Sequence, residues 1–289
     1  MKALDLKNIF LKELYPIYDK AEAESLFYLS LEYLLDIPRI QLNLNPEFTI
    51  LKPELDRFFE VLEKLKLHKP IQYIFGETEF FGLKFKVNQN VLIPRQETEE
   101  LIALILQNSY SKTNEPIQIL DIGTGSGIIA ISLAKELPNA KVYALDVSQN
   151  ALQVAKQNAK SNNVDINWIH ADILEKENWN LVFKNLKFNI IVSNPPYVRQ
   201  LEKTEIHPNV LDNEPHLALF VDDNNPLLFY KAITDFAVDK LKPNGQLFFE
   251  INEYLGNETK QVLVGSDFEA IQLLKDLNGK DRMLKGTLK

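Results

Sequence analysis

The alternation of short apolar segments with helical segments constrains the fold of this chain more than any other feature. From residue 117 onward, apolar runs of strand length recur, and stretches of helical length follow most of the first five. Such alternation is typical of a sheet with helices on both faces. The expected strands are 117–123, 141–148, 166–172, 188–195, 246–252, 268–276 and 282–288. The sequence therefore predicts an α/β fold with a doubly wound, seven-stranded sheet.

The first part of the chain follows a different pattern. Residues 21–36 and 53–68 repeat apolar side chains at spacings of three and four, which predicts amphipathic helices. Residues 74–95 then alternate apolar and polar side chains around glycines, which is typical of a β-hairpin. A chain of 289 residues is long enough for two cores. We therefore expect a small helical domain at 1–75, a hairpin linker at 76–95 and the α/β domain at 96–289.

Composition argues against several classes of function. Cysteine is absent and the four histidines show no metal-ligand spacing, so we expect no metal site. A net charge of -8 argues against direct binding of nucleic acid. No apolar run reaches the roughly 18 residues of a membrane span, and the first residues are charged where a signal peptide is apolar. We expect a cytoplasmic monomer with no membrane contact.

Glycine and polar residues follow four of the expected strands at the point where each ends. Taken singly, a glycine-rich turn or an acid before a helix is explained as well by turn formation or helix capping. Their joint placement predicts a ligand site, because ligands of doubly wound sheets bind beyond the carboxyl ends of the strands. The residues are Asp121, Gly123, Thr124, Gly125, Ser126, Gly127, Asp146, Asp172, Asn194, Pro195, Pro196 and Tyr197.

The glycine spacing distinguishes between cofactors. Residues 123–127 read G-x-G-x-G, whereas a dinucleotide site has G-x-G-x-x-G so that a pyrophosphate meets the start of the helix. Asp121, just ahead of the glycines, would repel a pyrophosphate but suits a cation. S-adenosylmethionine carries an ammonium and a sulfonium and therefore fits better. Asp146 can then accept hydrogen bonds from its ribose hydroxyls, and Asp172 from its adenine amino group.

With this cofactor, residues 194–197 suit the methylation of a planar NH2 group. The side-chain carbonyl of Asn194 and the backbone carbonyl of Pro195 can accept the hydrogens of an amide or an aromatic amine. Pro196 restrains the geometry of the preceding carbonyl, and the ring of Tyr197 can pack on the flat group. The alternative is a structural Pro-Pro turn beside a core tyrosine.

Beyond these motifs, the chain resembles the release-factor glutamine N5-methyltransferases (the PrmC/HemK family) over nearly its whole length. The similar segments are 70–101, 119–134, 144–159, 191–198, 213–220 and 276–286. The resemblance implies a Rossmann-like methyltransferase sheet and methyl transfer from S-adenosylmethionine to the glutamine of the Gly-Gly-Gln loop in peptide-chain release factors. It also implies that Ile173 lies with Asp172 near the adenine, and that the helical domain recognises the release factor.

Two segments depart from the family pattern. Residues 221–230 lack the usual Asp-Gly pair, and Asn252 follows Glu250 and Ile251 where the family has glycine after Glu-Ile. We expect neither to touch the transfer site. Arg95 and Glu97 are expected to form a hinge or a helix-start ion pair rather than to contact the cofactor. Glu250 can face the pocket or be a buried structural acid.

Two rival functions are weighed against this interpretation. An adenine-N6 methyltransferase of DNA or RNA faces the same chemical problem on a flipped base. The acidic balance and the absence of a basic, aromatic-rich recognition segment argue against it. The other rival is a non-catalytic module that binds S-adenosylmethionine or a translation factor. The intact motif from Asn194 to Tyr197 argues against that.

Overall fold

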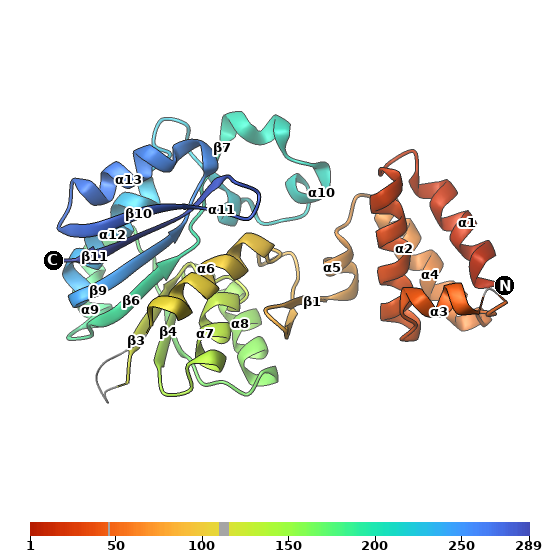
Figure 1. Cartoon of the computed structure of the whole chain (residues 1–289), viewed down its shortest axis with the longest axis horizontal. Coiled ribbons are helices and arrows are strands. Elements are labelled where there is room, and N and C mark those ends of the chain that lie inside the picture. Colours follow the sequence, from red (N-terminus) through yellow and green to blue (C-terminus); the bar gives the residue numbers. More distant parts are fainter. Residues whose placement is uncertain (46, 110–115) are drawn as a thin grey trace. The chain divides into compact units, whose positions relative to one another are not determined.

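The computed structural model describes residues 1–45, 47–109 and 116–289 (Figure 1). Two compact units make up the chain. One comprises Met1–Gly76 with Pro208–Asn213, and the other comprises Glu77–His207 with Glu214–Lys289. In the part of the chain that the structure describes, no helix is long and apolar enough to cross a membrane.

The first unit is helical. It contains α1 (Ala3–Leu14), α2 (Lys20–Leu35), α3 (Arg39–Leu44), α4 (Lys52–Lys66), α5 (Ile71–Phe75) and α10 (Pro208–Leu211). Helices α2 and α4 confirm the two helices expected from the apolar spacing. Asp19 caps α2 by accepting from Glu22 N at 2.8 Å. The buried rings of Phe10, Phe27 and Phe58 form the centre of this core.

A seven-stranded sheet, counted over the described residues, organises the second unit. Its order is β10 (Phe268–Lys275), β11 (Asp281–Leu288), β9 (Leu241–Glu250), β6 (Phe188–Ser193), β3 (Gln118–Ile122), β4 (Lys141–Asp146) and β5 (Asn167–His170). The five strands from β9 to β5 are parallel, and β11 and β10 add an antiparallel edge. All seven expected strands are confirmed.

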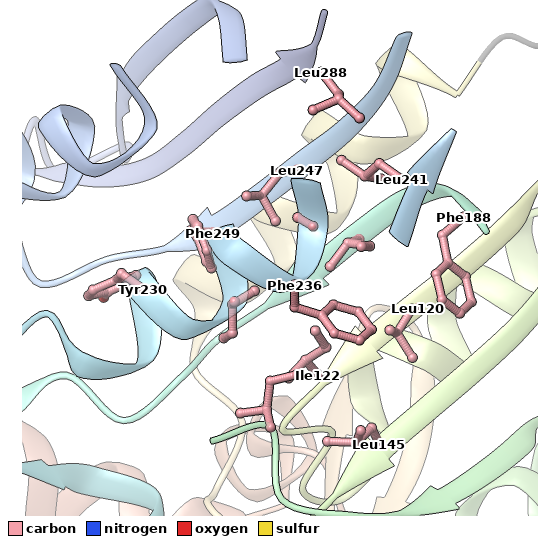
Figure 2. Packing of buried hydrophobic residues seen from close by; sticks show 14 of the residues in the cluster. Leu120, Ile122, Leu145, Phe188, Tyr230, Phe236, Leu241, Leu247, Phe249 and Leu288 are labelled. Atoms are coloured by element: carbon pink, nitrogen blue, oxygen red, sulfur yellow. The ribbon is translucent and has the colours of Figure 1, made fainter. Parts of the chain in front are cut away.

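Helices cover both faces of this sheet because its buried side chains alternate along each strand. Leu120, Ile191 and Leu247 face a core shared with α9 (Trp179–Phe183), α12 (Leu228–Lys240) and α13 (Gly256–Val264). The neighbouring positions of these strands face the opposite core, with α6 (Gln96–Asn108), α7 (Ile128–Glu136) and α8 (Gln149–Ser161). Figure 2 shows the first of these cores, with Phe236 of α12 among the sheet residues.

The strand order places a crevice at the carboxyl end of β3. The chain runs from β3 to β4 and β5 on one side and then returns to the other side of β3 as β6. At such a reversal the connections leave in opposite directions, and the gap between them is where doubly wound sheets bind ligands. The loops after β3, β4, β5 and β6 all meet at this edge.

The expected hairpin consists of β1 (Glu77–Phe80) and β2 (Leu83–Lys86) and belongs to the second unit. Its two turn residues, Phe81 and Gly82, have φ of +50° and +69°, which matches the strand twist that a tight hairpin needs. Lys86 N donates to Asn158 Oδ1 of α8 at 2.7 Å, and Asn158 Nδ2 donates to Lys86 O at 3.0 Å. These bonds pair the open edge of β2 with α8.

Short elements connect the strands near the crevice. They are the 3-10 turns at Lys176–Asn178, Gln200–Glu205 and Glu253–Leu255, the helix α11 (His216–Leu219), and the parallel pair β7 (Val198–Arg199) and β8 (Phe220–Val221). Strand β9 begins five residues before the expected position. Pro243, Asn244 and Gly245 suggest a loop, yet Leu241 still pairs with Phe188 of β6, with a register shift before Gln246. From Leu241 to Gln246 β9 advances five residues while β6 advances two, and Asn244 has φ of +61°, so the turn signal produces a bulge and regular pairing resumes at the expected position, Gln246.

Candidate active site

The loop between β3 and α7 has a conformation that favours glycine. Gly123, Gly125 and Gly127 have φ of +75°, +55° and +85°. A Cβ atom at Gly123 or Gly125 would meet no described atom within 4 Å, so the loop offers bare backbone there. At Gly127, a Cβ would lie 2.8 Å from Ile131 Cδ1 and 3.1 Å from Ala155 Cβ. Glycine at this position therefore allows α7 and α8 to approach closely.

Strand β4 holds this loop from the side. The backbone N–H groups of Gly123 and Thr124 donate to Leu145 O at 2.8 and 2.9 Å. Gly125 N donates to Asp146 Oδ2 at 2.8 Å, and Ser148 N donates to Asp146 Oδ1 at 2.8 Å. Burial raises the pKa of the Asp146 carboxyl. A carboxylate has about four acceptor positions, so Asp146 can still accept hydrogen bonds from a ligand.

Asp121 stabilises the loop between β3 and α7 by accepting hydrogen bonds. Its carboxyl is fully buried, and its Oδ2 accepts from Thr124 Oγ1 at 2.6 Å and from Ala130 N at 3.2 Å. Its Oδ1 has no hydrogen-bond partner among the described residues. Burial raises the pKa of this carboxyl to about 7. Sequence reasoning expected Asp121 to meet a cationic ligand, whereas in the structure its two hydrogen bonds both stabilise the loop and the helix after it.

Asp172 and Ile173 lie where the chain leaves β5. Asp172 Oδ1 accepts from Leu174 N at 2.9 Å, which stabilises the turn that follows β5. The side chain of Ile173 is buried, and its carbonyl accepts from Trp179 Nε1 at 3.0 Å. An acid and an apolar side chain are thus fixed side by side at the edge of the sheet.

Residues 194–197 follow β6 directly. Asn194 Nδ2 donates to Thr98 Oγ1 at 3.4 Å. The Tyr197 hydroxyl donates to Glu250 Oε1 at 3.1 Å, and its ring packs against the core around α12. Burial raises the pKa of this hydroxyl. Sequence reasoning expected the Tyr197 ring to pack on the substrate, whereas in the structure the side chain anchors the segment to β9.

An open cavity joins these strand ends. It encloses about 1120 Å³, counting the part open to solvent, and apolar side chains such as Leu217, Phe229 and Ile233 form much of its wall. The residues predicted from the sequence that line it are Gly123, Thr124, Gly125, Ser126, Asp146, Asp172, Ile173, Asn194, Pro195 and Pro196. Asp121, Gly127 and Tyr197 were also predicted as site residues, but they are not among the described residues that form the cavity wall.

Arg95 also lines the cavity, and its partner is not the one that the sequence suggests. Its Nη2 lies 2.5 Å from Glu214 Oε1, and Glu214 Oε2 accepts from Ile93 N at 3.0 Å. The Glu214 side chain is 1% exposed. Glu214 therefore fixes the strand-to-helix junction ahead of α6. In the sequence, Glu214 is a single acid inside the segment 213–220, and nothing there indicates that the fold brings it to Arg95.

Two residues at the end of β9 hold the Asn194–Tyr197 segment. Glu250 Oε2 accepts from Thr98 Oγ1 at 2.6 Å, and burial raises the pKa of the Glu250 carboxyl. Asn252 Nδ2 donates to Tyr197 O at 2.9 Å and lies 3.1 Å from Glu202 Oε2. Among the described residues, Asn252 does not line the cavity, but it contacts the Asn194–Tyr197 segment directly. Phe229 of the other departing segment, 221–230, does line the cavity, so the expectation that this segment stays away from the transfer site was wrong. Sequence reasoning did not single out Thr98, because a threonine in the first turn of a helix is common.

Comparison with known families supports a methyltransferase. Residues 99–217 match the Methyltransferase small domain, and residues 9–76 match the PrmC N-terminal domain. The release factor glutamine methyltransferase of Flavobacterium psychrophilum is 53% identical over 277 residues, which cover 96% of this chain and 95% of the relative. The protein of the same name from Streptococcus pneumoniae is 40% identical over 286 residues, covering 98% of each chain.

Solved structures agree on the fold. A methyltransferase from Pyrococcus furiosus superposes with a TM-score of 0.51 at 17% identity, covering 82% of this chain and 98% of that one. The 16S rRNA N2 G1207 methyltransferase of T. thermophilus, solved with AdoMet and guanosine, has a TM-score of 0.50 at 17% identity, covering 74% of this chain and 50% of that one. The fold and the site define a Rossmann-like methyltransferase. Identity over nearly the full length goes further, and the chain belongs to the release factor glutamine methyltransferase family.

Proposed function

We propose that this protein methylates the side-chain amide N5 of the glutamine in the Gly-Gly-Gln loop of peptide-chain release factors, with S-adenosylmethionine as the methyl donor. One observation carries the proposal: a single cavity is lined both by the open glycine loop and by Asn194 and Pro195. The names of the relatives support the substrate, since they are release factor glutamine methyltransferases.

The residues of the cavity fit S-adenosylmethionine. Gly123 and Gly125 offer bare backbone, and Asp146 keeps acceptor positions for the ribose hydroxyls. Asp172 and Ile173 suit the adenine, which is planar and carries an amino group. When bound, the cofactor supplies a methyl group on a positively charged sulfur, and that carbon–sulfur bond breaks as the new carbon–nitrogen bond forms.

Asn194 and Pro195 address the weakness of an amide as a nucleophile. The nitrogen lone pair of a glutamine side chain is delocalised into its carbonyl, so the amide must be held with that lone pair directed at the methyl carbon. Asn194 Oδ1 and Pro195 O are two acceptors for the two amide hydrogens. Each also stabilises the positive charge that grows on the nitrogen, by roughly 3 kcal/mol if it is as well organised as an oxyanion-hole group.

No strong base is needed beside these acceptors. Once the nitrogen has begun to gain positive charge, it releases a proton to water readily, so orientation is the main task of the protein. Pro196 has no N–H and a fixed φ, which restrains the Pro195 carbonyl. The bonds from Tyr197 to Glu250 and from Asn252 to Tyr197 O hold the segment from its far end.

The proposal includes further parts that follow from the substrate. Release factors are the protein partners, and the enzyme acts as a monomer in the cytoplasm, where release factors work. The helical domain recognises the release factor, and nucleic acid is not bound directly. The adenine-N6 alternative is not favoured, because the close relatives carry the name of the glutamine activity.

Mass spectrometry of a purified release factor, incubated with this protein and S-adenosylmethionine, tests the proposal. We expect one added methyl group on the loop glutamine. An unmodified factor in the presence of bound cofactor would contradict the proposed substrate. Methylated adenine in DNA or RNA incubated in parallel would support the alternative.

Substitution of Asn194 tests the residue assignment separately. Asn194→Ala should lose turnover and still bind S-adenosylmethionine, because the change removes an acceptor for the substrate amide. The matched control is Asn167→Ala, which removes an exposed asparagine at the opposite end of the sheet, at the start of β5. Unchanged methylation by Asn194→Ala would exclude the assigned role.

A further inference from the structure

The orientation of the Asn194 amide decides whether it can act as proposed. An asparagine side chain presents an acceptor oxygen at one end and a donor NH2 at the other, and a half-turn about the last bond exchanges them. The substrate amide offers hydrogens, so the oxygen must face it. In the opposite orientation, two NH2 groups would meet and the interaction would be repulsive. Some other group must therefore fix which end faces the substrate.

Thr98, in the first turn of α6, is the group in contact with Asn194. Its hydroxyl donates to Glu250 Oε2 at 2.6 Å, and Asn194 Nδ2 lies 3.4 Å from its oxygen. Both Thr98 and Glu250 are about 1% exposed, so water does not compete for the bond between them, and the bond from Asn194 is part-buried. A hydroxyl has one hydrogen, and here the short bond to the carboxyl uses it. Only lone pairs of Thr98 remain for Asn194, and these accept from an NH2 group and not from an oxygen.

Glu250 sets the direction of this chain of hydrogen bonds. Its other oxygen, Oε1, accepts from the Tyr197 hydroxyl at 3.1 Å. Burial raises the pKa of Glu250, but the hydrogen bonds from Thr98 and Tyr197 and the charge of Arg282 oppose that shift and favour the ionised form. An ionised carboxylate is an acceptor only, so both hydroxyls donate to it. Two bonds thus converge on Glu250, one from Thr98 and one from Tyr197 of the Asn194–Tyr197 segment, and in each the hydroxyl hydrogen points to the carboxylate.

We propose that Thr98 and Glu250 are positioning residues that hold the Asn194 amide with its oxygen toward the substrate glutamine. The inference rests on the proposed function for the identity of the substrate, and on the hydrogen bonds above for the orientation. Thr98 lines the cavity, whereas Glu250 does not, and in this scheme both act through the Asn194 amide. They act by making the productive orientation of Asn194 the stable one.

Kinetics of three variants test the inference. Thr98→Val removes the hydroxyl, and Glu250→Gln provides an amide that can donate to Thr98 and reverse the direction of the bonds. We expect kcat to fall about tenfold or more in both, a part of the hundredfold cost of removing a preorganised group, with KM for S-adenosylmethionine within about twofold. Thr98→Ser keeps a hydroxyl and should retain most of the wild-type kcat.

The matched control is Thr259→Val in α13. Thr259 is also fully buried, and its hydroxyl donates to Leu255 O at 2.8 Å, but it lies outside the cavity wall. The control should lose stability comparably and keep its kcat. Wild-type kcat in Thr98→Val, or an equal loss of kcat in Thr259→Val, would overturn the inference while leaving the proposed function intact.

An NMR measurement tests the contact between Thr98 and the Asn194 amide without any methylation assay. The side-chain NH2 signals of Asn194 can be assigned by their loss in Asn194→Ala. We expect Thr98→Val to shift these signals, Thr98→Ser to shift them little, and Thr259→Val to leave them in place. Signals that stay unchanged in Thr98→Val would show that Thr98 does not hold the amide, whether or not the protein methylates release factors.

Discussion

At Asp121, a single substitution can remove the ionisable carboxyl and still keep the two hydrogen bonds that this side chain accepts from the glycine loop and α7. Both of its bonds, from Thr124 Oγ1 and Ala130 N, end on Oδ2, and among the described residues Oδ1 has no partner. In Asp121→Asn, the single oxygen can take the place of Oδ2 and keep both bonds. The NH2 group then takes the place of Oδ1. This variant therefore removes the ionisation of the side chain and keeps its role in the loop.

The effect on stability depends on pH with a defined sign. From the ordinary value of 3.8 up to about 7, the folded chain keeps a proton that the unfolded chain has lost. The folded state binds more protons in this range, so the free energy of unfolding falls as pH rises, by about 1.4 kcal/mol per pH unit. Between pH 5 and pH 8 the wild type should lose about 3 kcal/mol through this group, and Asp121→Asn should not. Above pH 7 the contribution is constant.

Urea unfolding at pH 5 and pH 8 measures this difference. Tryptophan fluorescence reports on the correct unit, because the two tryptophans of the chain, Trp168 and Trp179, both belong to the α/β unit. An unpaired buried NH2 group costs about 1–3 kcal/mol, but equally at both pH values. Asp165→Asn, which removes an exposed carboxyl, controls for general charge effects. A difference between Asp121→Asn and wild type that is the same at both pH values would refute the reasoning.

Three further predictions follow from the contacts around the cavity. Gly127→Ala should lower the free energy of unfolding by about 1–3 kcal/mol, because a side chain is strained at φ of +85° and its Cβ would meet Ile131 at 2.8 Å; urea unfolding measures this. Glu214→Ala should cost about 1–3 kcal/mol in the same measurement by leaving Ile93 N unpaired, whereas Glu214→Gln keeps that bond and should cost under about 1 kcal/mol. Asn252→Ala should lower both the urea midpoint and kcat, because Tyr197 O loses its donor; an unchanged kcat would contradict a role in holding the segment.

The strands and their ends were predictable because both signals are local. Each apolar run identifies a strand, and the residue that follows it lies at the same edge as its counterparts once the sheet is parallel. That is why Asp146, Asp172 and Asn194, far apart in sequence, could be assigned to one site. The early start of β9 was missed because the pairing of Leu241 with Phe188 lies ahead of a bulge at Pro243–Gly245, and nothing local in the sequence indicates that pairing.

The supporting residues were not predictable because their signals are not local. Thr98 and Glu250 are separated by 152 positions, and nothing near either residue in the sequence indicates the bond between them. The same holds for Arg95 and Glu214, which are 119 positions apart. For Asp121, the position at the end of a strand was predicted correctly, but the direction in which its carboxyl points was not. Whether a carboxyl faces a cavity or lies beneath a loop depends on the packing of α7, which spacing does not encode.

Asn252 shows how a departure from the family pattern can be accommodated at the site itself. The resemblance described in the sequence analysis implies glycine here, which offers no side chain, whereas this chain places an amide whose Nδ2 donates to Tyr197 O and whose Oδ1 accepts from Tyr254 N at 2.9 Å. Both ends of the amide are thus engaged, and the residue is about 4% exposed. A buried amide with both ends bonded stabilises one arrangement of its neighbours over others. The end of β9 therefore holds the Asn194–Tyr197 segment twice, through the side chain of Glu250 and through the added side chain of Asn252.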